Sequence, residues 1–259
     1  MRITARENPR IRDLVHLTGS SRERRRRGVA LLDGAHLVQS MAAQPLSAEL
    51  LCASDGGLRH AEIERLFENT PSRRRLVLPD RLFEEISALA SPSGILAVVA
   101  VPDPGPLPAR IDDAVVLDGI QDTGNAGTIL RTAAAAGIQT VIACAGTAFL
   151  WSPKVLRAAM GAHFQLKLYE RGSADELVAR ASGTVAATTA DGTRSLFEMD
   201  LRVPVVWIFG NEGGGVSAAA RAAGATVRIP MAAGVESINV AISAAICLFE
   251  QRRQRLARA

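Results

Sequence analysis

The chain has 259 residues, of which 48% are hydrophobic and 22% charged, a balance typical of a globular protein with a buried core. No apolar run approaches the roughly 20 residues that a membrane span needs, and the opening MRITARENPRIRDL lacks the apolar stretch of a secretory signal. We therefore expect a cytoplasmic protein without a membrane partner. The three cysteines and four histidines show no metal-ligand spacing, which predicts reduced thiols and no bound metal.

Basic residues exceed acidic ones by only four, but many of them lie close together near the start of the chain. Arginine occurs at Arg2, Arg6, Arg10, Arg12, Arg22 and throughout Arg24–Arg27. Such a cluster is typical of a surface that binds a polyanion such as nucleic acid. A solvated helix face or a disordered arm has the same composition, so the cluster alone leaves these alternatives open.

The first hundred residues predict a small α/β domain, placed at residues 1–103. Apolar, strand-like runs at 31–32, 48–52, 76–78 and 95–101 are separated by helical stretches such as HAEIERLFEN and PDRLFEEISAL. The segment VPDPGPLPAR follows, and its four prolines exclude a helix or the interior of a sheet. We place a linker at residues 104–110.

Residues 111–259 predict a second α/β domain with a parallel sheet. Strand-like runs at 114–117, 140–143, 184–188 and 205–209 alternate with alanine-rich helical stretches. This alternation is typical of parallel strands joined by crossover helices.

The first strand of this domain runs into LDGIQDTGNAGTILRTAAAAG, residues 117–137. Its glycines match neither the dinucleotide fingerprint G-x-G-x-x-G nor a phosphate loop. Asn125 is well placed to cap the helix, and Gly127 lies one turn before Arg131, leaving room beside the guanidinium. An arginine there suits a phosphate near a helix N-terminus. It can equally extend into solvent.

The stretch FGNEGGGVS, residues 209–217, directly follows an apolar run. Consecutive glycines cost backbone entropy on folding, so they indicate that something comes close to the main chain. A bound ligand is one reading, and a tight turn from strand to helix is the other.

A third stretch, VRIPMAAGVESINVAISAAICLFE, begins with a short strand that breaks at a proline and continues as a helix. Ile238, Ile242, Ile246 and Phe249 form one apolar stripe along that helix. Ser237 stands where an N-cap belongs. Asn239, within the first turn, has a simple explanation as a residue bonded to nearby backbone.

Together these stretches, with SPKVLRAAMGAHFQL between them, resemble the ordered motifs of the SpoU (TrmH-like) RNA ribose 2′-O-methyltransferases of the SPOUT superfamily. The resemblance covers residues 111–250. It implies an α/β fold whose C-terminal part forms a deep trefoil knot, a homodimer, and S-adenosylmethionine held by main-chain groups of three loops. The front domain resembles the substrate-binding domain that many members carry, so the resemblance implies an RNA partner.

The resemblance also assigns roles to individual residues. The implied cofactor-binding residues are Thr188, Gly210, Ile229, Ser237 and Ile238. The implied catalytic residues are Asn125, Arg131, Glu212 and Asn239. Two positions depart from the family pattern: Thr123, where many members have proline, and Ile238, where leucine is common. Arg131 is expected to act either as a base or as a phosphate clamp, and the clamp is favoured because a guanidinium keeps its proton.

The expected reaction is methylation of a ribose 2′-hydroxyl in RNA. Ribosomal RNA is preferred because the additional domain indicates a large folded substrate, and transfer RNA is the alternative. A non-catalytic RNA-binding or assembly factor is a further alternative, disfavoured by the full set of polar residues. A nucleotide-dependent oxidoreductase is disfavoured because the dinucleotide fingerprint is missing.

Overall fold

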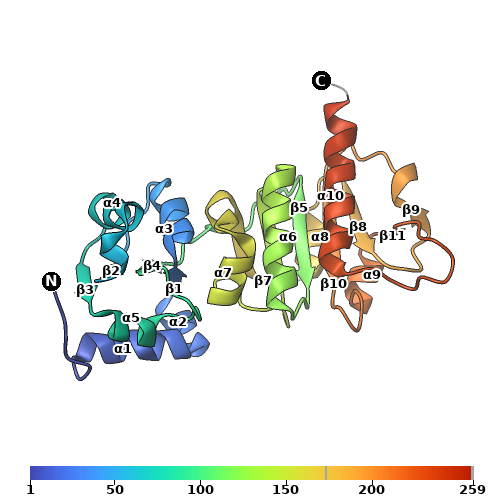
Figure 1. Ribbon diagram of the computed structural model, residues 1–259. Helices are drawn as coiled ribbons and strands as arrows, with labels where there is room; N and C mark the ends of the chain where they lie inside the picture. Colours follow the sequence, from blue (N-terminus) through green and yellow to red (C-terminus); the bar gives the residue numbers. More distant parts are fainter. Residues whose placement is uncertain (173, 258–259) are drawn as a thin grey trace. The chain divides into compact units, whose positions relative to one another are not determined.

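The computed structural model describes residues 1–172 and 174–257, and the chain forms two compact units (Figure 1). The first contains Met1–Asp103 and the segment Trp151–Phe164. The second contains Pro104–Leu150 and the chain from Gln165 onward. Within the part of the chain that the structure describes, every helix is too short or too polar to cross a membrane.

The first unit is built on a four-stranded sheet of order β1-β4-β2-β3. Strand β4 is antiparallel to β1 and β2, whereas β2 and β3 are parallel, so the expected α/β class is confirmed. The elements are α1 (Pro9–Gly19), α2 (Ser21–Arg27), β1 (Val29–Asp33), α3 (Ala35–Ala42), β2 (Leu50–Ser54), η1 (Gly57–Arg59), α4 (Ala61–Asn69), β3 (Arg75–Leu78), α5 (Asp80–Ile86), β4 (Ile95–Ala100) and, from the later segment, α7 (Pro153–Ala159), with η2 (Ala162–Gln165) after it.

Helix α1 shows how local sequence and packing agree in this unit. The Asn8 side chain accepts a hydrogen bond from the backbone N–H of Arg10 at 3.0 Å, and Pro9 is the first helical residue. The inner face of the helix buries Ile11, Leu14 and Leu17 among the side chains of the sheet, while the opposite face is polar.

The arginine cluster is largely occupied by contacts within the protein. Arg24 is 5% exposed and donates hydrogen bonds to the carbonyls of Leu17 and Thr18 at the end of α1. Arg26 and Arg27 both pair with the Glu23 carboxylate, and these guanidinium groups lower the pKa of Glu23 to about 2. The interpretation of Arg24–Arg27 as one phosphate-binding cluster is therefore wrong for Arg24, because a buried guanidinium cannot contact RNA.

The second unit contains a seven-stranded sheet of order β7-β6-β5-β10-β8-β11-β9. Each of its strand pairings is parallel, which confirms the predicted parallel sheet. The elements are β5 (Ala114–Asp118), α6 (Thr123–Ala136), β6 (Thr140–Cys144), β7 (Lys167–Gly172), α8 (Ala174–Arg180), β8 (Thr184–Thr188), β9 (Arg194–Ser195), η3 (Leu196–Glu198), β10 (Val205–Gly210), α9 (Ala218–Ala222), β11 (Ala225–Arg228) and α10 (Val240–Leu256).

Strand β10 lies between β5 and β8 and is buried along its whole length, as its uninterrupted apolar sequence requires. A polar network ties helix α10 to this centre. The Trp207 indole donates to Gln251 at 2.7 Å, and Gln251 donates to Asp113 at 2.8 Å. Arg255 donates to both oxygens of Asp113 at 2.7 and 2.9 Å. Burial raises the pKa of Asp113, but the Arg255 guanidinium and the N–H donors outweigh it and hold the pKa below its usual value.

Candidate active site

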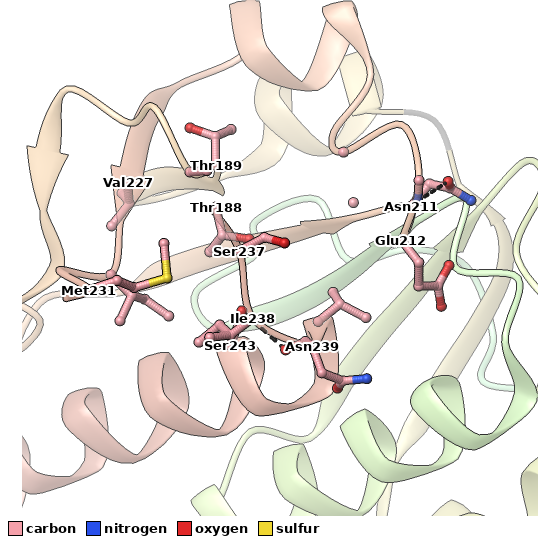
Figure 2. A pocket seen from close by; sticks show the side chains of 16 residues that line it. Thr188, Thr189, Asn211, Glu212, Val227, Met231, Ser237, Ile238, Asn239 and Ser243 are labelled. Carbon is pink, nitrogen blue, oxygen red and sulfur yellow. Dashed lines mark hydrogen bonds between the residues drawn. The ribbon is translucent and has the colours of Figure 1, made fainter. Parts of the chain in front are cut away.

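A cavity of about 480 Å³ opens where strands β8, β10 and β11 end. These strands are parallel neighbours, so the loops that follow them emerge at one edge of the sheet. Figure 2 shows the lining, which consists of Thr188, Thr189, Ala190, Gly210, Asn211, Glu212, Gly213, Gly215, Val227, Ile229, Met231, Ser237, Ile238, Asn239, Val240 and Ser243. All five residues expected to hold the cofactor are in this lining.

The glycine-rich loop after β10 is organised by the residue that begins it. Asn211 Oδ1 accepts hydrogen bonds from the backbone N–H groups of Gly213 at 2.9 Å and Gly214 at 3.0 Å. Its amide Nδ2 donates to the carbonyl of Gly119, at the end of the neighbouring strand, at 2.8 Å. Gly215 has a φ of +67°, in the left-handed region that favours glycine. Asn211 thus builds the turn and fastens it to the sheet.

Gly210 is required for a different reason. A Cβ atom at this position would collide with the backbone of Gly215 and Val216, because the loop folds back over the end of its own strand. A Cβ at Gly213 or Gly214 would meet only Asn211 Oδ1, at 3.6 and 3.8 Å. The glycines therefore serve the tight turn itself at Gly210 and Gly215, and leave open space at Gly213 and Gly214.

Three of the four expected catalytic residues form one hydrogen-bonded network. The Asn125 amide Nδ2 donates to Glu212 Oε1 at 3.0 Å, and Asn125 Oδ1 accepts from Asn239 Nδ2 at 2.9 Å. Glu212 and Asn239 line the cavity, whereas Asn125 connects them from α6. The network thus joins the three sequence motifs at a single place.

The structure corrects both predicted helix caps. The N-cap of α6 is Asp122, whose side chain accepts from the Asn125 N–H at 2.7 Å, and not Asn125. The N-cap of α10 is Asn239, which accepts from Ala241 and Ile242, and not Ser237. Because Asp122 caps the helix, the side chain of Asn125 is available for the network.

Glu212 is held as a charged carboxylate. Besides Asn125, it accepts from the backbone N–H groups of Gln121 at 3.4 Å and Asp122 at 3.3 Å. Burial raises the pKa of Glu212, but these donors outweigh it and the pKa lies below its ordinary value. The carboxylate therefore joins the loop after β5 to the loop after β10.

Arg131 is not part of this lining. It lies on α6 with its side chain exposed, beyond the turn that carries Asn125. The sequence analysis also missed several residues of the lining: Asn211, Thr189, Met231 and Ser243. Asn211 stands beside Glu212 in the glycine-rich motif, so its position in the motif was the available signal. No signal in the sequence pointed to the other three residues.

The lining fits S-adenosylmethionine chemically. Val227, Ile229, Met231 and Ile238 supply apolar surface for an aromatic ring, and Thr188, Ser237 and Ser243 supply hydroxyl groups. Glu212 is the single charged side chain in the lining, which suits a ligand that carries a cationic sulfonium. Among the described residues there is no cluster of three or more side chains that could hold a metal ion.

Comparisons with known proteins find relatives for both units of the chain. Residues 113–249 match the model of the SpoU rRNA Methylase family, and residues 8–97 match that of the MRM3-like substrate binding domain. The chain is 29% identical to the 23S rRNA (guanosine(2553)-2′-O)-methyltransferase RlmP of Bacillus subtilis, covering 96% of this chain and 98% of that protein. It is 31% identical to the 23S rRNA (uridine(2479)-2′-O)-methyltransferase of Streptomyces viridochromogenes, with coverages of 98% and 93%.

Solved structures show the same likeness in three dimensions. The crystal structure of the SpoU methyltransferase AviRb from Streptomyces viridochromogenes, in complex with the cofactor AdoMet, superposes with a TM-score of 0.88 at 26% identity. The match covers 97% of this chain and 99% of that one. Because the family model spans more than half of the chain and the cavity lies within the matched region, this protein belongs to the SpoU rRNA methylase family.

Proposed function

We propose that this protein transfers a methyl group from S-adenosylmethionine to a ribose 2′-hydroxyl of RNA, and that the RNA is ribosomal. The cavity at the ends of β8, β10 and β11, within the matched family region, is the observation that carries the proposal. The relatives named above methylate 23S rRNA by their names, which favours ribosomal over transfer RNA. The hydrogen-bonded network of Asn125, Glu212 and Asn239, of which Glu212 and Asn239 line the cavity, favours an enzyme over a binding factor.

Thr188, Gly210, Ile229, Ser237 and Ile238 would hold S-adenosylmethionine, which when bound supplies an electrophilic methyl group. The chain's own contribution is to position the hydroxyl for an in-line approach, since correctly oriented groups react as if at very high concentration. The network of Asn125, Glu212 and Asn239 gives the polar side of the cavity one fixed geometry.

Glu212 is better suited to positioning than to removing the hydroxyl proton. Its carboxylate already accepts three N–H donors, and its lowered pKa makes it a weak base. Arg131, exposed on α6, would hold an RNA phosphate with its guanidinium fork. The proton would then pass to water, while the guanidinium lowers the cost of the developing negative charge.

We also propose the domain division 1–103, 104–110 and 111–259, a trefoil knot in the C-terminal part, and a cytoplasmic location. Family membership and the matched ranges 8–97 and 113–249 support the first two. The bacterial relatives named for ribosomal RNA support the cytoplasmic location.

The segment Trp151–Phe164 packs with the first unit although it lies within the matched methylase range.

The function is tested by incubating the protein with ribosomal RNA transcribed in vitro and S-adenosylmethionine labelled in the methyl group. We expect the label in dinucleotides that resist alkaline hydrolysis, because a 2′-O-methyl group prevents attack on the adjacent phosphate. Label confined to ordinary mononucleotides would show base methylation and would contradict the proposal. Isothermal titration with S-adenosylmethionine and with NAD provides an independent measurement, in which only the first is expected to bind.

A homodimer is proposed from the surface of α10. Ile242, Phe249 and Leu256 recur every seven residues along this helix and are 55%, 47% and 60% exposed. A row of large apolar side chains on one helix is expensive to leave in water, so a second copy of the chain is the proposed cover. Part of the apolar stripe seen in the sequence thus faces outward.

Replacing Ile242 and Phe249 together by serine is expected to convert the dimer into a monomer in sedimentation velocity. Each chain would lose the apolar surface of two side chains that the interface buries. The control is Phe197→Ser in η3, which removes a side chain that is 57% exposed elsewhere in the same unit. A dimer that persists in the double variant, or that dissociates equally in the control, would contradict this interface.

A further inference from the structure

The arginines of the first unit fall into two groups. Arg2 pairs with Asp55, Arg6 with Glu85, and Arg26 and Arg27 with Glu23, while Arg24 is buried. Ion pairs thus compensate the charges of Arg2, Arg6, Arg26 and Arg27, while Arg24 donates to backbone carbonyls. The other group includes arginines that the sequence analysis did not single out, Arg73 and Arg74, which directly precede β3.

A groove of about 460 Å³ lies beside these two residues, entirely within the first unit. It runs between α1, the beginnings of β1 and β2, and the segment that enters β3. Its lining consists of Pro9, Arg10, Asp13, Leu14, Leu17, Arg27, Val29, Glu49, Leu50, Arg73, Arg74 and Val98. The floor is therefore aliphatic, and the charged side chains form the rim.

The charge of the groove is positive. Four arginines face two acids, and Asp13 is already paired with Arg27 at 2.5 Å. Arg73 and Arg74 are exposed, and across residues 1–172 and 174–257 neither forms an ion pair, nor does Arg10. Glu49 is the one acid of the lining that remains to offset these three guanidinium groups.

The backbone that carries the two arginines is fixed. The Arg73 N–H donates to the carbonyl of Ala48 at 2.8 Å, and the carbonyl of Arg74 accepts from Leu51 at 2.9 Å. The guanidinium groups thus extend from a rigid sheet edge rather than from a flexible arm, which lowers the entropy cost of holding a ligand between them.

We propose that the sugar–phosphate backbone of the RNA substrate crosses this groove and is bound by Arg10, Arg73 and Arg74. The proposal rests on the proposed function, since it concerns how the same enzyme holds its RNA. Guanidinium groups bind phosphate in a bidentate manner. No aromatic residue belongs to the lining, so the groove offers no aromatic platform for stacking bases. It therefore contributes affinity and leaves the choice of nucleotide to other contacts.

The test compares two double charge reversals in the full-length protein. The first is R73E/R74E in the groove. The matched control is R65E/R81E, which changes the net charge by the same amount at two exposed arginines of the same unit that lie outside the groove and outside the N-terminal arginine cluster. Binding of in vitro transcribed ribosomal RNA is measured over a series of salt concentrations, and S-adenosylmethionine binding is measured by titration.

R73E/R74E is expected to weaken RNA binding at least about tenfold at moderate salt. The slope of log K against log salt should become shallower by about 1.4, or about 0.7 for each lost contact with single-stranded RNA. The control should keep the wild-type slope. Both variants should bind S-adenosylmethionine as the wild type does, which also shows that they are folded.

Equal losses of RNA affinity in the two variants would show a general charge effect and would contradict RNA binding in the groove. Wild-type RNA affinity in R73E/R74E would contradict it as well. These outcomes leave the proposed function intact, because it is measured separately as methyl transfer by the wild-type protein. A wild-type protein that binds RNA through the groove and transfers no methyl group would overturn the proposed function alone.

Discussion

Arg131→Ala is expected to bind S-adenosylmethionine with wild-type affinity and to lose methyl transfer by about a hundredfold or more, the usual effect of removing a group that stabilises developing charge. The side chain lies on α6, is exposed and does not line the cavity, so its removal disturbs no contact of the cofactor site. Titration calorimetry measures the first quantity, and single-turnover transfer of labelled methyl groups to ribosomal RNA measures the second.

Two companion variants sharpen this experiment. Arg131→Lys keeps the positive charge and removes the planar fork, so partial activity is expected if the guanidinium acts as a phosphate clamp. Arg194→Ala, at an exposed arginine of β9 outside the cavity lining, is the control and should keep full activity. Undiminished turnover in Arg131→Ala would remove this residue from the proposed mechanism.

Among the glycines that line the cavity, Gly210 is expected to tolerate an added methyl group least, so Gly210→Ala should be the most damaging alanine substitution. The new Cβ would collide with the main chain of Gly215 and Val216, so relief requires the loop over residues 211–216 to move. Overpacking of this kind typically costs about 1–3 kcal/mol. If that cost falls on the bound state, affinity for S-adenosylmethionine drops roughly tenfold to a hundredfold. Titration calorimetry measures the affinity, and thermal unfolding reports any general loss of stability.

Gly214→Ala is the matched control for this change, because Gly214 is outside the lining of the cavity. It adds the same methyl group four residues further on, where the nearest neighbour is Asn211 Oδ1 at the ordinary contact distance of 3.8 Å. We expect affinity and stability close to those of the wild type. If Gly210→Ala behaved in the same way, the loop would not be held as the structure shows.

The strands that line the cavity could be predicted from sequence because they are buried on both faces. The runs at 184–188 and 205–209 coincide with β8 and β10, whose largely apolar sequences predict buried parallel strands. Strand β7, with the sequence KLYERG, was missed because it lies at the edge of the sheet and carries charged residues.

The helix caps could not be predicted, for a reason that lies outside the local sequence. Asp122 and Asn125 are both competent N-caps, as are Ser237 and Asn239. Asp122 caps α6, and the Asn125 side chain instead donates a hydrogen bond to Glu212, 87 residues further along the chain. N-cap propensity depends on the local sequence, so it does not include a hydrogen-bond partner that only the folded chain brings close.

The run Arg24–Arg27 shows the opposite error, because its local composition was interpreted as a phosphate-binding surface. Glu23 directly precedes the run and binds two of its arginines, and Arg24 turns inward to the end of α1. Composition alone cannot tell a charged side chain that closes a helix from one that faces solvent.

The hydrogen bonds that join Asn125, Glu212 and Asn239 span 87 and 114 residues of sequence. A chain still emerging from the ribosome therefore cannot complete this cluster until Asn239 has been synthesised. Long-range closure of this kind comes late in folding. A nascent chain that stops short of Asn239 would then lack a finished reaction centre, and methylating capacity would arise only after that residue has joined the cluster.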